Sequence, residues 1–143
     1  MGKRTKAREC ALQLLYQWDI TRWPIDRVVG RFWQLRSGTE EMKAMAERLA
    51  RGAQQEVGRL DEAIARASSN WRLDRIAPID RDILRLGAYE LMEERETPAS
   101  VIIDEAVELA KRFSEAEAPG FVNGVLDAIM REVRPGGPER KPS

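Results

Sequence analysis

Residues 7–18 of the chain read Ala-Arg-Glu-Cys-Ala-Leu-Gln-Leu-Leu-Tyr-Gln-Trp, and this stretch predicts an amphipathic helix. Its apolar side chains recur at intervals of three and four residues, which gathers them on one face of a helix. The members of this face are Ala7, Cys10, Ala11, Leu14, Leu15 and Trp18. Because such a face has to be covered by other apolar segments, the stretch predicts a helical core.

The same periodicity continues along most of the chain, and no segment shows the alternation typical of a strand. Further helices are predicted over residues 24–33, 40–67, 79–91, 98–113 and 119–133, with a short turn near Trp71 and Leu73. In the 79–91 segment, Gly87 and Ala88 lie on the apolar face and allow another helix to come close. The predicted fold class is all-α, with about seven helices in two packed helical subbundles.

A single domain of residues 1–134 is expected, because domains usually run to about 100–150 residues. The break near residues 68–78 divides it into predicted subbundles 1–67 and 68–134. Residues 135–143 are rich in proline and glycine and predict a disordered tail.

The composition argues against catalysis. The chain has no histidine, which removes the commonest general base near neutral pH and the commonest metal ligand. Its one cysteine, Cys10, lies on the apolar face, and no glycine-rich nucleotide motif is present. The carboxylates of Asp104, Glu105 and Glu108 are interpreted as a solvated helix face, because the di-iron bundle pattern also needs histidine. We therefore expect no enzyme activity, no metal and no cofactor.

Membrane insertion is not expected either. The longest uncharged stretches are nine residues, against the roughly 20 that a membrane helix needs. The basic N-terminus leads into an amphipathic helix and not into a signal peptide. With only one cysteine, the chain is typical of a reducing compartment, so a soluble, cytoplasmic protein is predicted.

The charges are unevenly placed along the chain. Basic and acidic residues both number 24, so the formal net charge is zero. Residues 1–8 nevertheless hold four cations and no acid, namely Lys3, Arg4, Lys6 and Arg8, which leaves a net charge of minus four on the rest. We call residues 1–8 the basic arm. Such a segment can approach phosphates, although a solvated, frayed terminus explains the same composition.

Two aromatic residues fall off the apolar faces of their helices. Tyr16 lies about 180° from Ala7 on a helical wheel, where it is able to stack on an unpaired base or pack against the other subbundle. Phe121 lies beside the apolar face of the helix predicted over residues 119–133. It is near the N-terminus of that helix, where free N–H groups and the helix dipole favour a phosphate. Its neighbours Asn123 and Gly124 permit either close approach to a ligand or tight helix packing.

Four blocks of sequence resemble the NusB family of transcription antitermination proteins. They are residues 4–16, residues 79–91, residues 101–113 and the block Phe121-Val122-Asn123-Gly124-Val125-Leu126-Asp127. The blocks occur in the family's order over about residues 4–130, and the last two are the most specific. The resemblance implies an all-helical fold with two subbundles.

The resemblance also implies a function. NusB proteins bind the boxA element of ribosomal RNA transcripts together with NusE, a small-subunit ribosomal protein, and help RNA polymerase pass terminators. The family's RNA-facing positions correspond here to Lys3, Arg4, Lys6, Arg8, Tyr16 and Phe121, and Asn123 belongs to the same block. Asp80 and Arg81 open the block that meets NusE. Four phosphate contacts by the arm would give a log affinity against log salt slope of about −3 on single-stranded RNA.

Two positions depart from the family pattern. Asp104 stands where asparagine is usual, and Pro119-Gly120 replaces a more polar, often basic pair, which removes one phosphate contact. Two alternatives stay open: a helical interaction module that binds no RNA, and a relative of the RNA-binding domain of a ribosomal RNA cytosine methyltransferase. We expect no catalytic domain after the tail, which disfavours the second. Family members include monomers and dimers, so a homodimer is compatible with the sequence.

Overall fold

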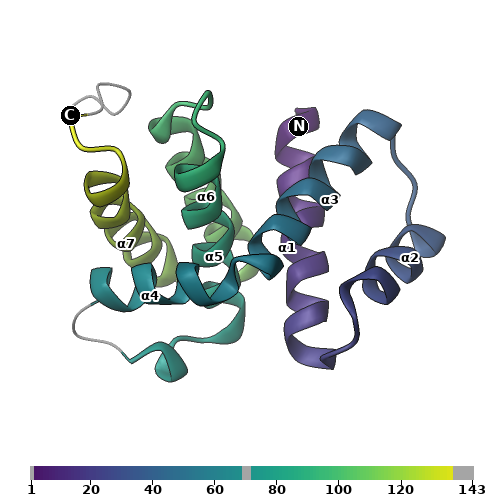
Figure 1. The fold of residues 1–143 in the computed structure, drawn as a ribbon, viewed down its shortest axis with the longest axis horizontal. Helices are drawn as coiled ribbons and strands as arrows, with labels where there is room; N and C mark the ends of the chain where they lie inside the picture. The colour runs from purple at the N-terminus through teal and green to yellow at the C-terminus, as the bar shows by residue number, and fades with distance from the viewer. Residues whose placement is uncertain (1, 69–71, 137–143) are drawn as a thin grey trace.

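The computed structural model describes residues 2–68 and 72–136, which form seven α-helices and one 3-10 turn (Figure 1). The elements are α1 (Lys3–Thr21), α2 (Ile25–Leu35), α3 (Glu40–Gln55), α4 (Val57–Ala67), η1 (Leu73–Arg75), α5 (Pro78–Glu93), α6 (Ala99–Phe113) and α7 (Ala118–Val133). These residues contain no strand, which confirms the predicted all-α class. Trp71 and most of the predicted tail lie outside the described residues.

The helices form two groups that meet along α5. In the first group, α1 packs mainly against α3 and also contacts α2, and the three lie together in Figure 1. In the second, α5, α6 and α7 pack against one another, and α4 packs against α5 and α7. Because α5 also contacts α1 and α3, it connects the two groups.

The single helix predicted over residues 40–67 is wrong: it is two helices that meet at Glu56. The apolar spacing continues across the junction through Ala53, Leu60 and Ile64, which is why periodicity alone does not reveal the change of direction. The break lets α3 cover α1 while α4 turns to cover α5 and α7 (Figure 1). The chain therefore leaves the first group of helices and enters the second at Glu56, before the predicted subbundle boundary at residue 67.

Capping and proline residues mark the starts of several helices, and two helices begin one residue later than predicted. The side chain of Thr39 caps α3 by accepting a hydrogen bond from the backbone N–H of Met42 at 3.1 Å. Pro24 and Pro98 are the N-cap residues of α2 and α6, whereas the sequence predicted that these helices begin at residues 24 and 98 themselves. Each proline sits where a missing N–H costs no helical hydrogen bond.

The centre of the core is α5, in which every residue from Asp82 to Ala88 is buried. A methyl group on Gly87 would lie 2.7 Å from Cδ1 of Leu126, so the predicted close approach of another helix at Gly87 is confirmed, and the partner is α7. Three of the buried side chains of α5 are charged: Asp82, Arg85 and Glu90. Across the described residues, no helix is both long enough and apolar enough to span a bilayer.

Candidate nucleic-acid interface

From Lys3 onward, the basic arm forms the first turns of α1. Lys3, Arg4 and Lys6 are exposed there, and the first turn of α1 holds no acidic residue. Lys3 lies 3.9 Å from Glu41, but both side chains are largely exposed, so this contact neutralises little charge. The exposed cations and the positive end of the helix dipole coincide, which makes this helix end attractive to an anion.

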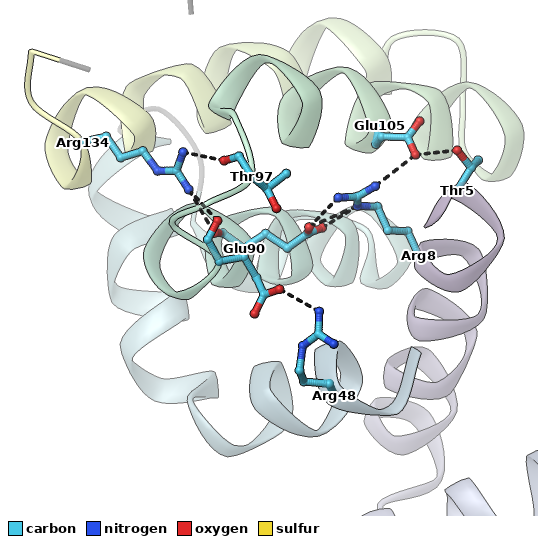
Figure 2. Close-up of polar contacts among 8 residues, drawn as sticks. Thr5, Arg8, Arg48, Glu90, Thr97, Glu105 and Arg134 are labelled. Carbon is cyan, nitrogen blue, oxygen red and sulfur yellow. Dashed lines mark hydrogen bonds and ion pairs between the residues drawn. The ribbon is translucent and has the colours of Figure 1, made fainter. Parts of the chain in front are cut away.

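Arg8 departs from the expectation that all four arm cations face RNA. Its side chain is only 4% exposed, and its guanidinium donates to both carboxylate oxygens of Glu90, at 2.8 Å from Nη2 and 2.9 Å from Nε (Figure 2). Nη1 also donates to Glu105 at 3.3 Å. Burial alone would lower the pKa of Arg8, but Glu90 and Glu105 raise it above its usual value. In this structure the guanidinium is therefore occupied and not available to a phosphate.

The contacts of Arg8 fix the basic arm against the second group of helices. Glu90 lies on α5 and Glu105 on α6, and Glu105 also accepts a hydrogen bond of 2.7 Å from the hydroxyl of Thr5. Figure 2 shows Thr5 and Arg8 on α1 pointing together toward these two carboxylates. The position of Lys3, Arg4 and Lys6 is thus set by the contacts of Thr5, which lies among them, and of Arg8, two to five residues farther along α1.

A second arginine secures the same region from the opposite side, and the sequence did not predict it. Arg134, which follows α7, is buried and donates to the backbone carbonyls of Leu91 at 2.9 Å, Thr97 at 2.8 Å and Glu94 at 3.1 Å. These carbonyls belong to the end of α5 and the loop to α6 (Figure 2). Arg48 of α3 binds the side chain of Glu94 at 2.8 Å.

The two aromatic candidates differ in how they are held. Tyr16 is half-buried but is not among the aromatic residues that pack on the core, whereas Phe121 packs partly against it from the first turn of α7. Asn123 is half-buried, and Gly124 is exposed with open space where a methyl group would lie. The departures from the family pattern are at the surface: Asp104 and Gly120 are exposed and Pro119 is half-buried.

Asp80 and Phe121 line the same open hollow, which has a volume of about 330 Å³. The hollow lies between the start of α5 and the start of α7, and Arg75, Ile76, Glu115 and Glu117 also line it. Asp80 accepts a hydrogen bond from the hydroxyl of Ser114 at the end of α6. A residue predicted to meet a protein partner and one predicted to meet RNA are therefore neighbours across a single concave surface.

Arg81 turns away from this hollow into the molecule. It donates to Asp19 of α1 at 2.9 Å, and its Nε atom is buried without a hydrogen-bond partner. This ion pair connects α1 to α5, so the structure gives Arg81 a role within the fold next to its predicted role in partner binding.

Arg81 belongs to a cluster of buried charges that sequence patterns did not indicate. Arg85 donates to both oxygens of Asp61, at 2.7 and 2.8 Å, and to Oδ1 of Asp82 at 3.0 Å. Burial, reinforced by the charge of Asp19, raises the pKa of Asp82 to about 8. Burial alone would also raise the pKa of Asp19, but Arg81 and Arg85 lower it below its usual value. Near pH 7 the cluster therefore favours an ionised Asp19 next to a neutral Asp82.

The residues that the structure describes contain no group of three or more His, Cys, Asp or Glu side chains able to hold a metal ion. Burial raises the pKa of the Cys10 thiol, which makes it a poor nucleophile.

Comparison with known proteins assigns this arrangement to a family. The model of the NusB family matches residues 5–131. The transcription antitermination protein NusB of Sorangium cellulosum is 49% identical over 133 residues, covering 93% of this chain and 95% of that protein. The NusB of Anaeromyxobacter dehalogenans strain 2CP-1 is 45% identical over 135 residues, covering 94% of each chain.

Solved structures agree with this assignment. NusB of T. maritima superposes with a TM-score of 0.84 at 32% identity, over 94% of each chain. A complex of the antitermination factors NusB and NusE with double-stranded RNA contains a chain with a TM-score of 0.83 at 26% identity, covering 92% of this chain and 98% of that one. With the sequence match and the fold both extending over nearly its whole length, this chain belongs to the NusB family.

Proposed function

We propose that the protein is a transcription antitermination factor that binds boxA RNA of ribosomal RNA transcripts together with NusE and supports processive transcription by RNA polymerase. The observation that carries the proposal is the full-length match to NusB proteins, including one solved in a complex with NusE and RNA. The role is one of binding, and it requires no catalytic group. The competing hypothesis is a helical interaction module that binds no RNA, and an RNA titration distinguishes the two.

The RNA surface that we propose combines the basic arm with the aromatic candidates. Lys3, Arg4 and Lys6 contact phosphates, while Tyr16 and Phe121 stack on unpaired bases and Asn123 contacts a base edge. Arg8 holds the arm in place through Glu90 and Glu105 and does not itself reach the RNA.

The NusE surface that we propose is centred on the hollow beside Asp80. Two further carboxylates, Glu115 and Glu117, line it, and ribosomal proteins that bind RNA are generally basic, so the charges are complementary. Arg81 contributes by fixing the start of α5 through Asp19. Because Phe121 lies across the same hollow, a protein bound there would sit next to the RNA, which explains why the two ligands bind together.

Replacing Phe121 by alanine is expected to weaken boxA binding by about 1–3 kcal/mol, the value of one stacked base. The measurement is fluorescence anisotropy of a boxA RNA titrated with the protein, in the presence and absence of NusE. Leu35→Ala is the control, because Leu35 is an exposed apolar residue at the end of α2, and α2 lies on the side of the molecule away from α7 (Figure 1). Equal and negligible binding by the wild type, by Phe121→Ala and by a chain lacking residues 1–8 would favour the module that binds no RNA.

The salt dependence of the same binding reports how many arm cations contact phosphate. Because Arg8 is buried, three cations remain, and the slope of log affinity against log salt is expected near −2, at about −0.7 for each phosphate. Lys3→Gln combined with Arg4→Gln should bring the slope to about −0.7. A wild-type slope near zero would remove the arm from the RNA surface.

A further inference from the structure

A second basic surface lies outside the arm, along α2 and the turn that precedes it. Residues 20–36 contain four arginines and one acid, Asp26, for a net charge of plus three. We call Arg22, Arg27, Arg31 and Arg36 the α2 arginines. All four are exposed, and the acid among them does not neutralise them because its carboxylate binds Arg51 of α3.

Most other surface arginines of the described chain differ from these. Arg48, Arg51, Arg59 and Arg66 each lie within ion-pair distance of a carboxylate on another element. Arg22, Arg27 and Arg31 form no ion pair with any described residue. The formal neutrality of the chain therefore hides uncompensated positive charge at α2 as well as at the arm.

Aromatic rings accompany these cations. The guanidinium of Arg27 lies 4.0 Å from the ring centroid of Trp23, and that of Arg36 lies 4.9 Å from the centroid of Phe32. Lys43 of α3 lies 5.5 Å from the ring of Trp33. Cation–π contacts hold guanidinium groups over aromatic rings, and guanidinium planes also stack on nucleic-acid bases.

We propose that the outer face of α2 binds the single-stranded RNA that flanks the boxA element, a role that rests on the proposed function. Arg27 and Arg31 are one helical turn apart, about 6 Å along the axis, so each is placed to meet a separate phosphate. Gly30 and Gln34 are exposed on the same helix, and open space surrounds the position where a methyl group on Gly30 would lie. Uncompensated cations with aromatic side chains beside them are features that sequence-tolerant binding of a single strand uses.

The charge pattern favours RNA over a protein partner. The central parts of protein interfaces are depleted in charged residues and rich in apolar contact. Here the exposed apolar side chains, Leu35 at 78% and Ile20 at 55%, lie at the two ends of the surface, and charge occupies its middle. Figure 1 places α2 at the edge of the molecule beyond α1 and α3, on the side away from α7. An RNA that reaches both Phe121 on α7 and the α2 arginines must therefore extend beyond a minimal element.

The experiment compares two RNAs on the same protein with NusE present. The short RNA is a boxA element of about 12 nucleotides, within the usual size of a single-strand site. The long RNA carries the same element extended on both sides by unstructured oligouridine. We expect the long RNA to bind more tightly, with a log–log salt slope steeper by about 1.4, which is about 0.7 for each of two phosphates. That gain should shrink about sevenfold between about 50 and 200 mM salt.

Arg27→Gln combined with Arg31→Gln should abolish the gain of the long RNA and leave the short RNA unaffected. Arg59→Gln combined with Arg66→Gln is the matched control, because it removes the same charge from exposed arginines that carboxylates on α5 and α7 already bind. This control should keep the gain.

The outcomes separate this inference from the function on which it rests. Failure of the wild type to bind the short RNA would overturn the proposed function. Binding of the short RNA with no additional affinity for the long one would overturn the α2 surface alone. A gain that survives Arg27→Gln with Arg31→Gln would likewise exclude α2 and leave its charge to a different partner, such as an acidic protein.

Discussion

Replacing Arg8 by methionine is expected to lower the free energy of unfolding by about 3–5 kcal/mol, the usual cost of breaking a buried ion pair by removing one partner. Glu90 is the residue left behind. It is 4% exposed and would lose all three hydrogen bonds that Arg8 donates to it. Leu49, Ile83, Leu86 and Ile102 line the small void beside the pair, so no polar side chain there replaces the guanidinium.

The expected loss of stability in Arg8→Met comes from leaving the Glu90 carboxylate buried and unpaired, and not from the loss of the Arg8–Glu90 attraction itself. Arg8→Met combined with Glu90→Leu should therefore recover most of the stability, because well-packed apolar residues often replace a buried ion pair at little cost. Urea denaturation of the two single variants and the double variant forms a double-mutant cycle that isolates this coupling. Arg48→Met is the control, since its pair with Glu94 is half exposed and should contribute no more than about 1 kcal/mol. An equally small loss in Arg8→Met would show that Glu90 finds solvent or another partner.

The sequence predicts the parts of this fold that depend on local periodicity. The apolar face of α1 is confirmed member by member, apart from Trp18, which is only partly buried, and the close approach at Gly87 is confirmed as well. The junction at Glu56 escapes prediction because a change of helix direction leaves the spacing of apolar residues intact. Periodicity reports which side of a helix is buried but not which element covers it.

The position of Arg8 could not be predicted for a different reason. Its neighbours in sequence are cations, so it reads as part of a basic arm, but its carboxylate partners are 82 and 97 positions away. Asp19 and Arg81 are likewise 62 positions apart. Pairings over such separations leave no local pattern. Without the resemblance to a family, a charged residue on a helix is most simply interpreted as solvated.

The positive charge of α2 is not apparent when the net charge is summed over all residues after the basic arm. Dividing the chain into an arm of plus four and a remainder of minus four treats the remainder as uniform, although residues 20–36 alone carry plus three. Only the structure shows which cations have a carboxylate within reach. Arg27 directly follows Asp26 in the sequence, yet Asp26 pairs with Arg51, 25 positions away.

Replacing Asp82 by asparagine is expected to change how stability depends on pH. Asp82 is fully buried, and its Oδ2 atom accepts no hydrogen bond, which a neutral carboxyl tolerates far better than a carboxylate. Its pKa is raised to about 8 in the folded protein, against 3.8 for an ordinary aspartate. Between these values the folded state binds a proton that the unfolded chain releases, so raising the pH favours unfolding.

Relative to a variant that cannot titrate at this position, the wild type should lose about 1.4 kcal/mol of unfolding free energy for each unit that the pH rises. This loss should level off near pH 8, where Asp82 of the folded protein begins to ionise. Over pH 5 to 8 the difference in unfolding free energy between Asp82→Asn and the wild type is therefore expected to move by about 3–4 kcal/mol in favour of the variant. The change in this difference is the quantity to measure, because the amide and the acid also differ by a constant amount in their hydrogen bonds.

The measurement is urea denaturation of the wild type and Asp82→Asn at several pH values between 5 and 8. Asp19→Asn is the control variant. The lowered pKa of Asp19 keeps it ionised in both states throughout this range, so its replacement should reduce stability by an amount that does not vary with pH. Two neighbouring carboxyls that both contact Arg85 would then differ in how the effect of their replacement depends on pH. A flat difference for Asp82→Asn would mean that Asp82 is ionised in the folded protein, with Arg85 compensating both charges at once.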